Sequence, residues 1–239
     1  MPTKAQLAVN AIQEKYGTFD PSKMQVQRWQ YYDNVRLPVG GTNRLTFFTN
    51  PIGAVDPNAN TVNKTLEETN VRRSGELDEA FVIMALKTEI SILPITRQPA
   101  GVIAVTDAVV QSLTPIHAAL RNLYYQGVLS VAFGQKQYIQ IEQPFQMCPP
   151  GYGPSIRSIS SNGAGLFFPL SNYVRPSNDP RDVYQMTPPI MVEKGQTFSA
   201  TVDFYNANTP NMTAITVGGA NVAVNVGITF DGYVLRPIQ

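Results

Sequence analysis

The stretch from Asn221 to Gln239 has the most regular hydrophobic pattern in the chain. Apolar residues occupy every second position, and small or polar residues stand between them. The apolar set is Val222, Val224, Val226, Ile228 and Phe230. This alternation predicts a strand lying over a core. At Asp231-Gly232 the next apolar residues, Tyr233 and Leu235, change parity, which predicts a bulge or a tight turn. A long strand placed last suggests a sheet that closes against the beginning of the chain.

Further strands are predicted where β-branched and aromatic residues gather. They cover Val26 to Pro38, Leu45 to Phe48, Phe81 to Leu93, Leu129 to Phe133, Tyr138 to Ile141, Ile190 to Val192 and Phe198 to Phe204. Gly40-Gly41 predicts a turn joining the first two strands, and Glu193 to Gln196 predicts a hairpin between the last two. The two apolar stretches on either side of Gly134 predict a hairpin or a bulged strand. One face of the Phe81 strand is apolar, through Val82, Met84, Leu86 and Ile90.

Two short amphipathic helices are predicted. The first starts at Thr3 and Gln6, which have the spacing of a capping box, and stops at Gly17. It either packs on its own domain or forms an arm that docks on a neighbouring subunit or a membrane. The second starts at Thr114-Pro115 and ends before Gly127.

Two long segments, 49–77 and 143–189, have no hydrophobic period and are rich in Pro, Asn and Gly. Connections of this length in a compact domain normally carry function or make contacts. Ordering them costs conformational entropy comparable to the stabilisation from the strand faces. We therefore expect these segments to be fixed by contacts with partners.

Eight or nine strands, two short helices and no repeated βαβ unit predict an all-β fold, an antiparallel β-sandwich. A helix and two long insertions interrupt the strand order, which favours Greek-key or jelly-roll connections. A double jelly roll needs roughly sixteen strands, so a single jelly roll is favoured. The expected organisation is an N-terminal helical arm over residues 1–24 and one jelly-roll domain over 25–239.

The chain has 18 basic and 17 acidic residues, and only 15% of its residues are charged. This balance gives no bulk attraction to nucleic acid, and no sequence-specific nucleic-acid partner is predicted. No apolar run approaches the roughly 20 residues of a membrane span, and the start lacks a signal-peptide core. We expect synthesis in a cytoplasm.

Candidate chemistry is sparse. His117 is the only histidine and lacks the spacing of a triad or a metal site, and Cys148 is the only cysteine, with no disulfide partner. Asp56 to Asn60 and Asn178 to Asp182 offer oxygen ligands without the spacing of a calcium loop. Several acids could approach in space, although solvated loop acids are the simpler interpretation: Glu67, Glu68, Glu76, Asp78, Glu79 and Glu142. No catalytic, cofactor-binding or metal residue is predicted, and no enzyme.

Three runs carry a resemblance to a known family. They are Thr69-Asn70-Val71-Arg72-Arg73-Ser74-Gly75-Glu76-Leu77, the exit from Gln143-Pro144 to Pro149-Pro150-Gly151, and the ending from Ile228 to Gln239. Over residues 25–239 the chain resembles jelly-roll capsid proteins of bacterial viruses, especially tailless icosahedral bacteriophages. The resemblance implies a capsid subunit that self-assembles into an icosahedral shell through loop and arm contacts. Its partners would be copies of itself and other virion proteins, and its place the virion, after synthesis in the host cytoplasm.

Two other functions stay open from the residues. A carbohydrate- or receptor-binding module of a phage vertex, spike or tail tip would use Trp29, Tyr31 and Tyr32 as a sugar-stacking surface. An enzyme on a β-sandwich would need acids such as Glu76 or Glu142.

Overall fold

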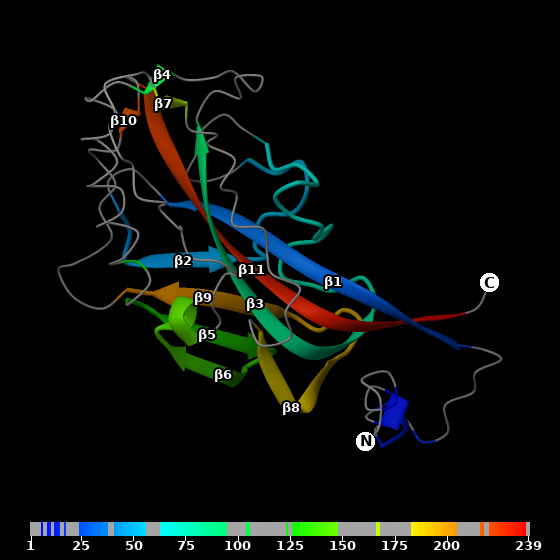
Figure 1. Cartoon of the computed structure of the whole chain (residues 1–239). Helices are drawn as coiled ribbons and strands as arrows, with labels where there is room; N and C mark the ends of the chain where they lie inside the picture. The colour runs from blue at the N-terminus through cyan, green and yellow to red at the C-terminus, as the bar shows by residue number, and fades with distance from the viewer. Residues whose placement is uncertain are drawn as a thin grey trace.

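The computed structural model describes most of the strands and part of the connections. The described residues are 6, 9–10, 12–14, 17, 24–37, 41–55, 63–94, 104–105, 123, 126–147, 166–167, 183–204, 216–217 and 220–237. They form two antiparallel sheets packed face to face (Figure 1). The predicted all-β antiparallel sandwich is therefore confirmed.

In the described part of the chain, eight strands of four or more residues build the two sheets. They are β1 (Met24–Leu37), β2 (Arg44–Phe47), β3 (Ala80–Pro94), β5 (Val128–Phe133), β6 (Lys136–Glu142), β8 (Tyr184–Val192), β9 (Phe198–Asp203) and β11 (Ala220–Pro237). Three strands have two residues each: β4 (Ala104–Val105), β7 (Leu166–Phe167) and β10 (Thr216–Val217). One short helix, α3 (Pro144–Met147), follows β6.

The order of strands folds the chain back on itself. The first sheet runs β1-β11-β3-β8, with β10 on β11, the second runs β2-β9-β5-β6, and β4 pairs with β7. The first long strand thus pairs with the last, the second with the second last and the third with the third last. β5 and β6 form the hairpin at the centre of this arrangement. The expectation that the final strand closes a sheet against the start of the chain is confirmed by the β1–β11 pairing.

Two of the predicted hairpins are wrong. β1 and β2 lie in different sheets, and so do β8 and β9. The turn between β8 and β9 does form, because the Gln196 N–H donates to the Glu193 carbonyl at 3.1 Å and Gly195 has a φ of 72°. This turn carries the chain from one sheet to the other, because β8 and β9 each pair within the sheet that buries their apolar face. The β5–β6 hairpin is confirmed, with a register shift between Val131 and Ala132.

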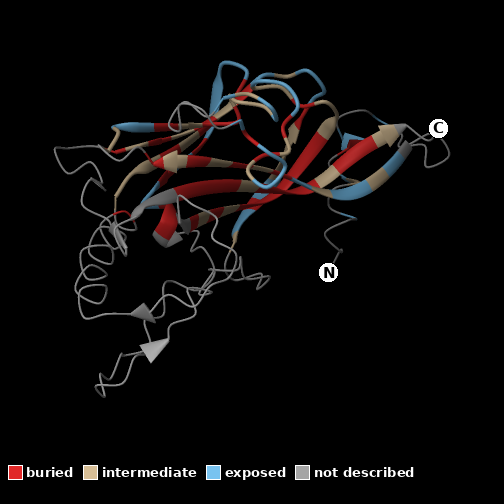
Figure 2. Ribbon diagram, turned by 90° about the horizontal axis from the view of Figure 1, so that it is seen from above, coloured by how far each residue is buried: buried red, intermediate tan, exposed pale blue. Residues whose placement is uncertain are grey.

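The main core fills the space between the two sheets (Figure 2). Its centre is a group of packed aromatic rings. The ring of Phe48 lies 5.0 Å from that of Phe198 and 5.2 Å from that of Phe230, and Phe133 packs against the latter two at 6.3 and 6.4 Å. These rings come from both sheets, so they hold the sheets together.

A second, smaller cluster lies on the outer face of the first sheet. There Ile12 of the N-terminal segment packs with Val82, Met84 and Leu235. The prediction that Val82 and Met84 share a face of β3 with Leu86 is therefore wrong, because they lie on the opposite face from this core residue. With this cover, the start of β3 is apolar on both faces.

The change of parity is in β3 and not in β11. Ala85 pairs with Asp231 and Ile83 pairs with Gly232, so Met84 is the extra residue of a bulge. The shift falls beside Asp231-Gly232, as predicted, but β11 keeps its alternation through it. A Cβ on Gly232 would stand 1.9 Å from the Val82 carbonyl oxygen, so this close approach of the two strands requires glycine.

The two predicted helices lie largely outside the described residues. Gln6, Val9, Asn10 and 12–14 are helical, and Ile12 is buried against its own sheet, which favours packing on its own domain over a free arm. Of the predicted second helix, Leu123 and Gln126 are described, and Leu123 is helical.

The prediction of an irregular 143–189 segment is wrong where residues are described. It contains α3, β7 and the start of β8, which begins at Tyr184 and not at Ile190. Pro188 and Pro189 hid this strand in the sequence. Proline is tolerated here because β8 lies at the edge of its sheet.

Candidate assembly surface on the 49–77 segment

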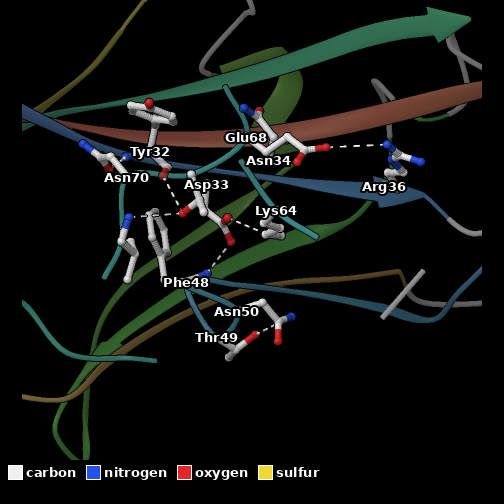
Figure 3. A network of polar contacts seen from close by, with 12 residues as sticks. Tyr32, Asp33, Asn34, Arg36, Phe48, Thr49, Asn50, Lys64, Glu68 and Asn70 are labelled. Atoms are coloured by element: carbon white, nitrogen blue, oxygen red, sulfur yellow. Dashed lines mark hydrogen bonds and ion pairs between the residues drawn. The ribbon is translucent and has the colours of Figure 1, made fainter. Parts of the chain in front are cut away.

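Residues 68–70 run along the outer edge of β1 between Gln30 and Asn34 (Figure 3). The Asn34 N–H donates to the Glu68 carbonyl at 2.7 Å, and the Asn70 N–H donates to the Tyr32 carbonyl at 3.3 Å. The Asn70 side chain adds two bonds, since its Nδ2 donates to the Gln30 carbonyl at 2.6 Å and its Oδ1 accepts from the Tyr32 N–H at 3.0 Å. The segment thus satisfies backbone groups that an edge strand would otherwise present to other chains.

A buried ion pair anchors the segment inside the sandwich. The Lys64 Nζ lies 2.5 Å from Asp33 Oδ1, and each side chain is 1% exposed. The other carboxylate oxygen of Asp33 accepts from the Phe48 N–H at 2.6 Å, at a position where Phe48 has a φ of 64°. Asp33 shares the core-facing side of β1 with Tyr31 and Val35, so Lys64 reaches in from the edge.

The surroundings of Asp33 act on its charge in opposite directions. Burial raises the pKa of Asp33, while the Lys64 ammonium and the hydrogen bond from Phe48 lower that pKa. Two charges without water are stable only when each has its partner, and removing one partner from such a pair typically costs about 3–5 kcal/mol. The ion pair therefore fixes where the segment sits.

The expectation that the 49–77 segment is fixed only by contacts with partners is wrong for its described residues. Lys64, Thr69, Val71 and Leu77 are all buried within the single chain. The physical reason is that the segment brings its own apolar and charged anchors. These contacts offset the conformational entropy that the segment loses when it is ordered. The hydrophobic pattern of the sequence did not reveal them.

The outward side of this segment carries exposed apolar residues. Ile52 is 37% exposed, Val55 53% and Leu66 65%. Val55 pairs with Asn63, and the Gly53 N–H donates to the Lys64 carbonyl at 2.9 Å, so the turn that carries Ile52 lies beside the chain at Asn63 and Lys64. We define Ile52, Val55 and Leu66 as the apolar triplet. Among described residues, the other large exposed hydrophobic residues are Tyr138 and Tyr184.

Comparisons with protein-family models, with curated proteins and with solved structures found no match. Among the described residues, no helix is both long enough and apolar enough to cross a membrane.

Three of the candidate acids pair with different arginines. Glu68 pairs with Arg36 at 3.6 Å, Asp78 with Arg73 at 3.6 Å, and Glu79 with Arg236 at 2.7 Å. Glu142 is exposed at the end of β6, in the other sheet. No three His, Cys, Asp or Glu side chains of the described part gather as metal ligands would.

The three aromatic residues considered for sugar stacking do not form one exposed surface. Tyr31 is buried in the core, where its ring meets Phe81 edge to face at 5.0 Å. Tyr32 points to the opposite face of β1, and the Arg236 guanidinium lies 4.9 Å from the Trp29 ring centre. The predicted sugar-stacking surface is therefore wrong.

His117, Cys148 and the candidate cation ligands at 56–60 and 178–182 lie outside the described residues. The residues that the sequence reasoning missed are Asp33 and Lys64. Asp33 carried a signal, because it occupies a core-facing position in an otherwise apolar and aromatic alternation between Tyr31 and Leu37. Lys64 carried none, since it stands in a segment without period.

Proposed function

We propose that this sandwich is a single jelly roll. If the eight long strands are numbered along the chain, the sheets have the orders 1-8-3-6 and 2-7-4-5. This order results when one long hairpin of eight strands is rolled up, so that successive strand pairs fall alternately in the two sheets. Such a double Greek-key arrangement is the jelly-roll pattern. The strand count supports one jelly roll in this chain.

We further propose that the protein is a virion structural protein, a capsid subunit that assembles into a shell with copies of itself. The observation that carries this proposal is the apolar triplet on a segment that the buried ion pair holds rigidly. An apolar surface on a fixed support loses little conformational entropy on binding, so it suits a repeated contact. Exposed apolar groups gathered on one element are typical of protein contact sites.

The positions of the long connections support the same proposal. The segments 95–127, 143–183 and 204–219 leave from the ends of β3, β6 and β9. The register places Glu142 and Asp203 on either side of Val128, so β6 and β9 end together at one end of the sandwich (Figure 1). β4 and β7 pair two of these segments with each other. Connections of this length normally carry function or make contacts.

The proposed mechanism is assembly by mass action. The sandwich supplies a rigid body, and several modest contacts per subunit add up through symmetry. No single contact then needs high affinity, and the near balance of charges lets copies approach closely. The role of the subunit within the virion, in the main shell or at a vertex, follows from its copy number per particle.

The test is the assembly state of the purified full-length protein. Light scattering and negative-stain microscopy over a range of concentrations should show rings or shells that grow with concentration. A triple variant, Ile52→Ser, Val55→Ser and Leu66→Ser, should assemble at clearly higher concentration than the wild type. The matched control is Tyr184→Ser, an exposed residue on β8, which should assemble normally. A protein that stays monomeric at every concentration contradicts the proposal.

A further inference from the structure

The edges of the two sheets differ in how they are protected. Residues 68–70 bond to β1 between Gln30 and Asn34, and β2 has only four residues. β8 pairs with β3 at Tyr184-Gln185 and again at 190–192, and the residues between have no β3 partner. Two of these, Pro188 and Pro189, have no N–H to donate. Short strands, bulges and proline are the usual ways in which proteins prevent strand pairing at an edge.

β6 has seven residues without proline and forms the outer strand of the second sheet (Figure 1). Its bulge lies at Tyr138, so the stretch from Ile139 to Glu142 keeps a regular edge. The Gln143 N–H donates to the Gly127 carbonyl at 3.0 Å. Hydrogen-bonded pairs alternate along antiparallel strands, so the backbone groups of Gln140 and Glu142 point away from β5. No described residue forms a hydrogen bond with these outward groups.

Charges along β6 are arranged to match a second copy of the same strand. At one end the Lys136 Nζ lies 5.1 Å from the Tyr138 ring centre, which brings the ammonium beside Tyr138. At the other end stands the exposed Glu142. Gln140 lies midway between Tyr138 and Glu142. An antiparallel copy turned about Gln140 therefore places Glu142 opposite Tyr138 and close to Lys136.

We propose that β6 pairs with β6 of a second copy of this chain, about a two-fold axis through Gln140. The two outward backbone groups of Gln140 then bond to Gln140 of the other copy, and Glu142 meets Lys136 twice. Such strand addition at a free edge would join the two four-stranded sheets into one. A two-fold contact uses the same surface on both copies, which fits a self-complementary strand. The inference rests on the proposed function, because it names one of the contacts between subunits.

The first test reverses charge on the full-length protein, with self-association measured by analytical ultracentrifugation. Lys136→Glu places like charges opposite each other twice and should weaken association about tenfold. Glu142→Lys should weaken it to the same extent. The double variant restores two opposite-charge pairs and should associate as the wild type does. Arg72→Glu, at an exposed residue next to the segment that runs along β1, is the control and should have no effect.

The second test uses the backbone. Gln140→Pro removes an N–H that does not serve β5, so the subunit should stay folded by circular dichroism while association at this edge is lost. If both single reversals associate like the wild type, or the double variant stays weak, the pairing of β6 is wrong. Shells that form regardless of these variants would overturn this pairing and leave the proposed function standing. Two-fold dimers that respond to the charge reversals but never form particles would overturn the proposed function and leave the pairing of β6 standing.

Discussion

The edge strands β1 and β6 differ in whether their outward backbone groups have hydrogen-bond partners. Where β1 ends the first sheet, the chain folds 68–70 over the edge and buries Lys64 against Asp33 to hold it there. Where β6 ends the second sheet, the backbone groups of Gln140 and Glu142 stay open among the described residues. Since open backbone groups at an edge can pair with another chain, the comparison teaches that the Gln140 to Glu142 stretch of β6 is a candidate contact.

The largest expected effect concerns the buried ion pair. Lys64→Met leaves the Asp33 carboxylate buried without its partner and should lower the free energy of unfolding by about 3–5 kcal/mol. Urea denaturation measures this loss. The matched control is Arg28→Met, whose partner is Asp231 and whose side chain is 67% exposed, and it should cost less than about 1 kcal/mol.

The double variant Asp33→Leu with Lys64→Met tests how much of the lost stability comes from the unpaired charge. It removes both charges and should recover the part of the lost stability that comes from the charge left alone, while the Phe48 N–H loses its acceptor at a cost of about 1–3 kcal/mol. Equal losses in Lys64→Met and Arg28→Met would mean that the anchor of the covered edge is no stronger than a surface pair.

A proline substitution at each edge should distinguish the covered edge from the open edge by its cost in stability. The Asn34 N–H donates to Glu68 at the covered edge, so Asn34→Pro should cost about 1–3 kcal/mol. Gln140→Pro at the open edge should cost less than about 1 kcal/mol, because the N–H it removes has no partner among the described residues. Thermal unfolding of the two variants gives the comparison, and similar losses at both positions would remove the distinction between the edges.

A smaller effect is expected at Asn70. Asn70→Ala removes the side-chain bonds to the Gln30 carbonyl and the Tyr32 N–H, and should cost about 1–2 kcal/mol. Hydrogen exchange should show faster exchange of the Tyr32 amide. Asn50→Ala is the control, since the Asn50 side chain reaches only Thr49 at 3.5 Å, and it should leave the Tyr32 amide protected. An unchanged Tyr32 amide in Asn70→Ala would mean that other contacts hold the segment on β1.

The smallest effect depends on pH. Burial raises the pKa of Glu89 on β3. A carboxyl with a raised folded pKa contributes its stability below its unfolded pKa and loses it as pH rises through the folded pKa. Glu89→Gln should therefore be more stable relative to the wild type at pH 7 than at pH 4. Urea denaturation at both pH values measures this, and a difference that does not change with pH would contradict it.

Local pattern predicted the strands well and their partners poorly. The alternation in Phe198 to Phe204 and in Asn221 to Phe230 found β9 and most of β11, because side chains of a strand alternate between its faces. The same alternation gave no information about pairing, so the Glu193 to Gln196 turn was interpreted as a hairpin although it crosses between sheets. The candidate surface was located only as a segment without period, and its rigid anchor was not foreseen.

The sequence by itself determined the fold class, the approximate strands, the closing of the chain end on its start and the glycine at the β3–β11 bulge. Only the tertiary structure decided that Ile12 covers the outer face of the first sheet, that the bulge residue is Met84, and that Lys64 lies inside the sandwich. The reason is that alternation reports which positions avoid water. It does not report which distant segment excludes that water, and every one of these contacts joins residues far apart in the chain.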